Sequence, residues 1–212
     1  DDEMYAYTFA GWSPEIQDVT GAKTYRPIYD KTRIGFGSAT IAADGSWAII
    51  DGMSSEFIDR EADYREIAGD VTINRHFVAK KYSTIVLPFE TRTGDVPGFS
   101  FYSFKDVEKV NGVWENVVFG YVDEKQDGDK VIEANTPYIV VADRDMDCMV
   151  VKNGVKLDLG YAKYFYSENY GWRFTGTYEY RQWDSDHNVK EIGTTYGFAG
   201  AEGDNTETSI GT

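Results

Sequence analysis

The sequence predicts an all-β protein, an antiparallel β-sandwich preceded by a small two-stranded unit. Short runs of β-branched and aromatic residues recur along the 212 residues, and aromatic residues make up 16% of the chain. Such residues favour strands and supply the apolar groups that a core needs. Asp-Gly and Asn-Gly pairs, the residues of two-residue hairpin turns, separate several of these runs. They are Asp44-Gly45, Asn111-Gly112, Asp127-Gly128 and Asn153-Gly154.

The first thirty residues predict the small unit. In residues 5–9, aromatic residues alternate with Ala and Thr, which is the period of a strand, and a turn follows at Ser13-Pro14. Residues 24–29 predict a second short strand, and Pro27 makes it an edge strand. Because so small a unit has few apolar groups, Trp12 is expected to fill its core. The alternative is that its ring stacks on a ligand.

Residues 31–212 predict the main domain, a sandwich of jelly-roll or Ig-like type with a possible sub-boundary near residue 69. A hairpin is expected around Asp44-Gly45, and loop or one short helix over residues 54–66. Continuous apolar runs at residues 85–87 and 138–141 predict the central core strands, because a strand covered on both faces has no polar side. From Trp172 to Trp183, alternation of apolar and polar residues predicts a strand with one solvated face.

Residues 7–16 read Tyr-Thr-Phe-Ala-Gly-Trp-Ser-Pro-Glu-Ile and are followed by Val19-Thr20-Gly21 and Thr24-Tyr25. This stretch resembles the C-terminal half of the Listeria-Bacteroides repeat, a short β-grasp-like unit related to the B-repeats of internalin B. The resemblance implies a partial surface repeat over residues 1–30 and a location outside the cell. It names no ligand.

A second resemblance begins near residue 70 and depends on the order of several motifs. The series is similar to an all-β module of unknown activity in multidomain secreted proteins of Fibrobacter and Bacteroidetes. Similar modules continue past the Tyr-Gly-Phe-Ala segment with two more strands, so the last sheet partner is expected to be missing here. The matching segments are residues 71–77, 83–89, 101–104, 133–140, 172–178 and 196–199.

Composition excludes several classes of partner. The net charge of −15 makes nucleic acid and anionic membrane surfaces unfavourable partners, because both require positive charge. A single cysteine, Cys148, excludes an internal disulfide framework. No apolar run is long enough for a membrane helix, and the acidic N-terminus lacks the pattern of a signal peptide, so any leader is expected upstream.

Asp143, Asp145 and Asp147 are the candidate metal ligands. In an extended segment these alternating carboxylates would point to one side, and such oxygens suit calcium. The sequence indicates no other cofactor. An EF-hand is excluded because its glycine and glutamate positions hold Cys148 and Gly154. The alternative is a solvated hairpin between residues 141 and 149, in which the charges protect an exposed edge.

Trp183, Trp114 and Tyr180 are the candidate carbohydrate-binding residues. Sugar-binding sandwiches stack aromatic rings on pyranose rings beside polar groups, and strand alternation places Trp183 on the polar face. The alternative is that these rings cover the rim of a sheet. His76 and His187 belong to no metal or hydrolase motif, and Cys148 has no basic neighbour that would stabilise a thiolate.

Three functions remain open. The first is a non-catalytic structural, adhesive or spacer module of a secreted or cell-surface bacterial protein. The second is a carbohydrate-binding module, and the third is a glycoside hydrolase-type enzyme, which needs two carboxylates facing one cleft. The expected partners are other domains of the same polypeptide and a polysaccharide or a host or cell-surface protein.

Overall fold

The computed structural model describes residues 4–16, 18, 21–122, 130–167, 171–176, 178, 186, 196–198 and 207–209. For residues 114, 115, 196–198 and 207–209 it describes the backbone alone. Strands account for nearly all the regular structure, so the all-β prediction is confirmed. Within these residues, no helix has the length and apolar character needed to cross a membrane.

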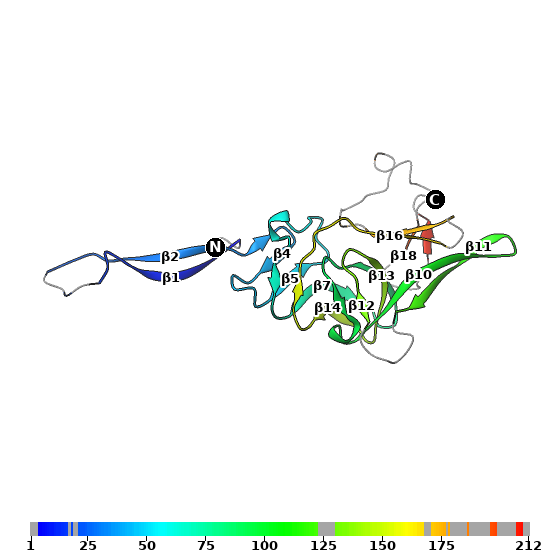
Figure 1. The fold of residues 1–212 in the computed structure, drawn as a ribbon, viewed down its shortest axis with the longest axis horizontal. Helices are drawn as coiled ribbons and strands as arrows, with labels where there is room; N and C mark the ends of the chain where they lie inside the picture. Colours follow the sequence, from blue (N-terminus) through cyan, green and yellow to red (C-terminus); the bar gives the residue numbers. More distant parts are fainter. Residues whose placement is uncertain are drawn as a thin grey trace.

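The N-terminal strands form an antiparallel hairpin that projects from one end of the molecule (Figure 1). Strand β1 (Tyr5–Ser13) pairs with β2 (Arg26–Arg33), and in the described part of the chain this two-stranded sheet has no third strand. Strand β2 runs through residue 30, where the sequence placed the end of the small unit.

A five-stranded sheet in the order β14-β7-β5-β4-β3 forms one layer of the body. The Asp44-Gly45 turn joins β4 to β5 as predicted: Gly45 has φ +71°, and the Ser46 N–H donates to Asp44 Oδ1 at 2.9 Å. Strands β5 and β7 are parallel, and the sheet contains strands from both sides of residue 69. The strands are β3 (Gly35–Phe36), β4 (Ala39–Ile41), β5 (Ala48–Asp51), β7 (Val71–Phe77) and β14 (Met146–Val151).

A four-stranded antiparallel sheet in the order β11-β10-β13-β8 forms the second layer. The Asn111-Gly112 turn, with φ of +52° and +84°, joins its two longest strands as predicted. The strands are β8 (Tyr82–Val86), β10 (Phe99–Val110), β11 (Val113–Tyr121) and β13 (Pro137–Ala142).

The core lies between the two sheets. Buried residues of both belong to one hydrophobic cluster, and the Phe77 ring of β7 meets the Phe99 ring of β10 edge to face at 4.9 Å. The predicted core strand at residues 138–141 is confirmed, because β13 has neighbours on both sides and five of its six residues are buried.

Short elements complete the body. β16 and β17 lie beside the four-stranded sheet (Figure 1), where Phe174 packs against Phe104 and Phe119 at 5.7 and 5.9 Å. The expectation for residues 54–66 is confirmed, because the segment holds one short 3-10 helix. The paired strands are β6 (Glu66–Ile67) with β15 (Val155–Lys156), β9 (Thr91–Arg92) with β12 (Val131–Ile132), β16 (Tyr164–Tyr166) with β17 (Arg173–Thr175), and β18 (Tyr196–Phe198) with β19 (Glu207–Ser209); the 3-10 helices are η1 (Arg60–Ala62) and η2 (Thr93–Asp95).

Two expectations were wrong. The segment around Asp145 does not close a hairpin, because β13 and β14 belong to different sheets and the chain crosses from one layer to the other. Strand β18 does not lack a partner, because it pairs with β19. Residues 85–87 lie in the core as predicted, because Ile85 and Leu87 are buried in the cluster that both sheets share. In the described sheet, β8 is nevertheless an outer strand.

Candidate functional site: an aromatic hairpin

The β1–β2 hairpin carries the most extensive group of exposed aromatic side chains that the structure describes. Tyr5, Tyr7 and Phe9 stand on one face, opposite Arg33, Lys31 and Tyr29 of β2. A β-bulge between Phe9 and Gly11 then shifts the register by one residue. Regular alternation would turn Trp12 to the other face, but the extra residue returns it to the face of Phe9. The Phe9 and Trp12 ring centroids are therefore 5.6 Å apart.

This aromatic face, formed by Tyr5, Tyr7, Phe9, Trp12 and Tyr29, is open to solvent. The exposed fractions are 53% for Tyr7, 51% for Phe9, 41% for Trp12 and 53% for Tyr29. The prediction that Trp12 fills a core is therefore wrong. Trp12 contacts the exposed ring of Phe9 instead. The prediction failed because the alternation pattern of one strand does not reveal the bulge that places the two rings side by side.

The rings contact one another edge to face. Phe9 lies at the centre, with Trp12 at 5.6 Å and Tyr29 at 5.9 Å between ring centroids. Lys31 Nζ lies 3.6 Å from the centroid of Tyr5 and 5.6 Å from that of Tyr7, within the range of cation–π attraction. The face is thus apolar along most of its length and cationic near the body.

The hairpin differs in charge from the rest of the chain. Its strands hold three cations, Arg26, Lys31 and Arg33, and one anion, Asp30, so they carry a net charge of +2. Because the whole chain has a formal net charge of −15, the residues outside these two strands carry −17. Strand β1 has no charged residue at all, so its outer edge lacks the charges that usually discourage strand pairing.

A two-stranded hairpin is at best marginally stable in water, because it has no second layer to cover its apolar side chains. Every residue of β2 except Arg33 is exposed. Contiguous exposed apolar surface of this kind marks a contact site more often than an idle surface. The hairpin is therefore the best candidate for a functional surface.

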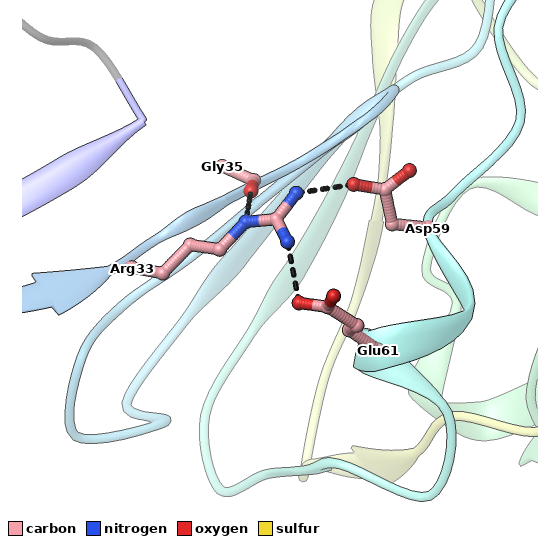
Figure 2. Close-up of polar contacts among 4 residues, drawn as sticks. All are labelled: Arg33, Gly35, Asp59 and Glu61. Carbon is pink, nitrogen blue, oxygen red and sulfur yellow. Dashed lines mark hydrogen bonds and ion pairs between the residues drawn. The ribbon is translucent and has the colours of Figure 1, made fainter.

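The base of the hairpin is fastened to the body by Arg33 (Figure 2). Its Nε donates to Gly35 O at 2.8 Å, one guanidinium nitrogen donates to Glu61 at 2.5 Å, and the other donates to Asp59. Burial acts to lower the pKa of Arg33, but Glu61 and Asp59 together raise it above its ordinary value. The guanidinium therefore stays charged and bridges β2 to the segment that holds η1.

Replacing Arg33 with glutamine is expected to loosen this base without unfolding the core. Glutamine cannot bridge Asp59 and Glu61, so hydrogen exchange should accelerate at the β1 and β2 amides and stay unchanged in β7 and β13. Arg26→Gln is the matched control because it removes the same charge at the opposite end of β2, where Arg26 pairs with Ser13 of β1. Equal acceleration in both variants would contradict the role assigned to Arg33.

The sequence-predicted sugar-binding residues are not brought together in the described structure. Trp183 and Tyr180 lie outside the described residues, and for Trp114 only the backbone is described, opposite Lys109 in the β10–β11 ladder. Their sugar-binding role stays a prediction. The alternation predicted from Trp172 onward is followed as far as the described residues allow, because Trp172 and Phe174 are partly buried and Arg173 is exposed.

A smaller group of exposed aromatics lies on β16. Tyr164 and Tyr166 share one face, with ring centroids 5.4 Å apart and ring planes at 76°, and Arg173 of β17 lies 5.4 Å from the Tyr164 centroid. Tyr164 and Tyr166 are about half exposed. The sequence pattern gave no indication of this group, because its tyrosines are separated from Arg173 by a chain reversal.

The three candidate calcium ligands each have a different neighbour. Asp143 Oδ1 lies 3.2 Å from Lys80 Nζ, Asp145 Oδ1 accepts the Ala79 N–H at 2.7 Å, and Asp147 Oδ1 lies 3.1 Å from His76 Nδ1. Among the described residues, no group of three or more His, Cys, Asp or Glu side chains is arranged to hold a metal ion. Calcium binding stays a prediction, and an increase in melting temperature on adding calcium would reveal it.

Comparison of the chain with protein-family models, with curated proteins and with solved structures gave no match.

Proposed function

We propose that this chain is a non-catalytic module of a secreted or cell-surface bacterial protein, and that it serves a structural and adhesive role through the β1–β2 hairpin. The observation that carries the proposal is the exposed aromatic face, which lies on a hairpin that projects beyond the body (Figure 1). The resemblance of residues 7–25 to a bacterial surface repeat agrees with this role and with an extracellular location.

The attachment of the hairpin to the body also supports the proposal. A core shared by two sheets gives the hairpin a packed base, and Arg33 joins the hairpin to that base through Asp59 and Glu61. Because the two strands are already paired, the aromatic face loses less conformational entropy on binding than an unstructured segment would, which favours contact with another macromolecule. Other domains of the same polypeptide and a host or cell-surface protein remain the proposed partners.

The proposal is tested with beads that carry the purified chain. Their retention is measured under flow on surfaces coated with bacterial cells, with host matrix proteins and with polysaccharides. The hairpin variant Phe9→Ser/Tyr29→Ser is expected to lose most of the retention. The matched control is Tyr164→Ser/Tyr166→Ser, which removes two exposed tyrosines from the body. No retention of the unaltered chain on any surface would refute the adhesive role.

Carbohydrate binding is a second candidate, favoured by the exposed Tyr164 and Tyr166 beside Arg173. Their ring planes stand at 76° to each other, whereas rings that stack side by side on one sugar chain are near coplanar. Affinity electrophoresis in soluble plant polysaccharides separates the two candidates. Retardation that is lost in Trp183→Ala or in Tyr164→Ser/Tyr166→Ser would favour sugar binding, and unchanged migration in every polymer would reject it.

A further inference from the structure

We propose that the aromatic face of the hairpin packs against the same face of a second copy of this chain, with the two hairpins antiparallel. The inference rests on the proposed contact role of the hairpin and names its partner. It follows from the area of the face, from the charge along the hairpin and from the charge of the body.

The area of the face suits a weak and reversible dimer. An aromatic side chain buries about 150–250 Å² when fully covered, so four half-exposed rings offer roughly 400 Å² per copy and about 800 Å² across two copies. The four rings are Tyr7, Phe9, Trp12 and Tyr29. Tyr5, Pro27 and the apolar stem of Lys31 share this face and bring the total toward about 1,000 Å², the lower end of specific interfaces.

The charge of the body selects the antiparallel orientation. Outside the strands of the hairpin the chain carries −17, so two bodies placed side by side would repel each other. In the antiparallel arrangement they lie at opposite ends of the paired hairpins. The nine residues of β1 span about 30 Å, several times the Debye length of about 8 Å at physiological ionic strength. The repulsion between bodies is then largely screened.

The charge along the aromatic face favours the same orientation. Lys31 lies on this face near the body. At the far end Glu15 and Asp18 are balanced by Lys23 and Arg26, so that end is close to neutral. An antiparallel pair sets Lys31 of each copy toward this neutral end, where Glu15 lies, whereas a parallel pair sets the two Lys31 side chains together. The middle of the interface comes from β1, which has no charged residue, so no ion has to be buried there.

Sedimentation velocity of the purified chain tests the proposal. The concentration series runs from about 1 µM to about 500 µM, the range in which an interface of this size dissociates. The unaltered chain is expected to shift from monomer to dimer within this range. Phe9→Ser/Tyr29→Ser should stay monomeric, and Tyr164→Ser/Tyr166→Ser should dimerise like the unaltered chain. Equal melting temperatures would show that the body is intact in all three.

A charge exchange tests the orientation while all five rings remain in place. Lys31→Glu places acid against acid in an antiparallel pair and is expected to weaken dimerisation about tenfold, and Lys31→Glu/Glu15→Lys should restore it. Failure of the double variant to recover would overturn the antiparallel arrangement. A chain that remains monomeric throughout would overturn self-association, and so would a dimer that persists in Phe9→Ser/Tyr29→Ser. Neither result depends on bead retention, which tests adhesion separately.

Discussion

Replacing Phe77 with alanine is expected to lower the free energy of unfolding by about 3–5 kcal/mol, the usual cost of removing a buried aromatic ring. Phe77 is fully buried at the end of β7, and its ring meets Phe99 of the other sheet. The substitution therefore opens a cavity between the two layers. Because small domains are stable by only about 5–15 kcal/mol, the loss should move the urea midpoint substantially.

The control for Phe77 is Ile49→Ala in β5 of the same sheet. Ile49 is exposed, so its truncation removes few contacts and is expected to cost less than about 1 kcal/mol. Equal shifts of the urea midpoint in the two variants would show that the space between the sheets is not the main core.

Replacing Gly37 with alanine is expected to cost clearly more stability than replacing Gly112 with alanine. Gly37 has φ +61°, where an L-residue pays about 1–2 kcal/mol. An added Cβ would also lie 2.2 Å from the carbonyl oxygen of Phe57, which is backbone and cannot swing aside. Forcing the two segments apart adds about 1–3 kcal/mol, the cost of overpacking.

Gly112→Ala isolates the conformational part of this cost. Gly112 also has a positive φ, +84°, but a Cβ there meets no atom within 4 Å. Thermal and urea unfolding should therefore show a modest loss in Gly112→Ala and a clearly larger one in Gly37→Ala. Similar losses would mean that the Phe57 segment moves away freely. Phe57 packs on Tyr178 at 4.8 Å, so its displacement should also change the near-ultraviolet circular dichroism.

Local chemistry made the turns predictable from sequence. Asn111-Gly112 closes a hairpin because both residues adopt the positive φ angles that a two-residue turn needs. At Asp44-Gly45 only the glycine has a positive φ, and the Asp44 carboxylate accepts the Ser46 N–H instead. The Asn153-Gly154 turn has the same local geometry as Asn111-Gly112, with φ of +66° and +74°. The strand that follows it, β15, nevertheless pairs with β6 instead of β14. Turn residues thus determine where the chain reverses, and distant segments determine which strands pair.

The same limit explains why the sequence did not reveal the outer position of β8 and why the expectation before β14 was wrong. An apolar run reports that both faces of a strand are covered, which holds for β8: Ile85 is buried, and Gly176 lies so close to Val86 that a Cβ would come within 2.1 Å of Cγ2. It does not report how many strands lie beside it. The aspartates before β14 likewise predict a reversal without revealing that the chain moves to the other sheet.

The candidate site was less predictable than the fold. Alternation identified β1 as a strand, but the bulge that brings Trp12 beside Phe9 depends on the register with β2. Exposure of the aromatic face depends on whether a second layer covers the two-stranded sheet, which composition cannot reveal. The predicted sugar-binding side chains, Trp183, Trp114 and Tyr180, lie outside the described side chains and remain a prediction.

The connection at the base of the hairpin has a mechanical consequence. The carbonyl of Met4, just before β1, accepts hydrogen bonds from the N–H groups of Ile34 and Gly35, just after β2. Tension applied at Met4 therefore passes directly to the body across these two bonds, and the seventeen strand residues of the hairpin lie outside the path of the load. The aromatic face keeps its shape under a pull that these bonds withstand. Once these two bonds break, the β1–β2 hydrogen bonds break in turn from the base outward. The hairpin then extends before the force reaches the body.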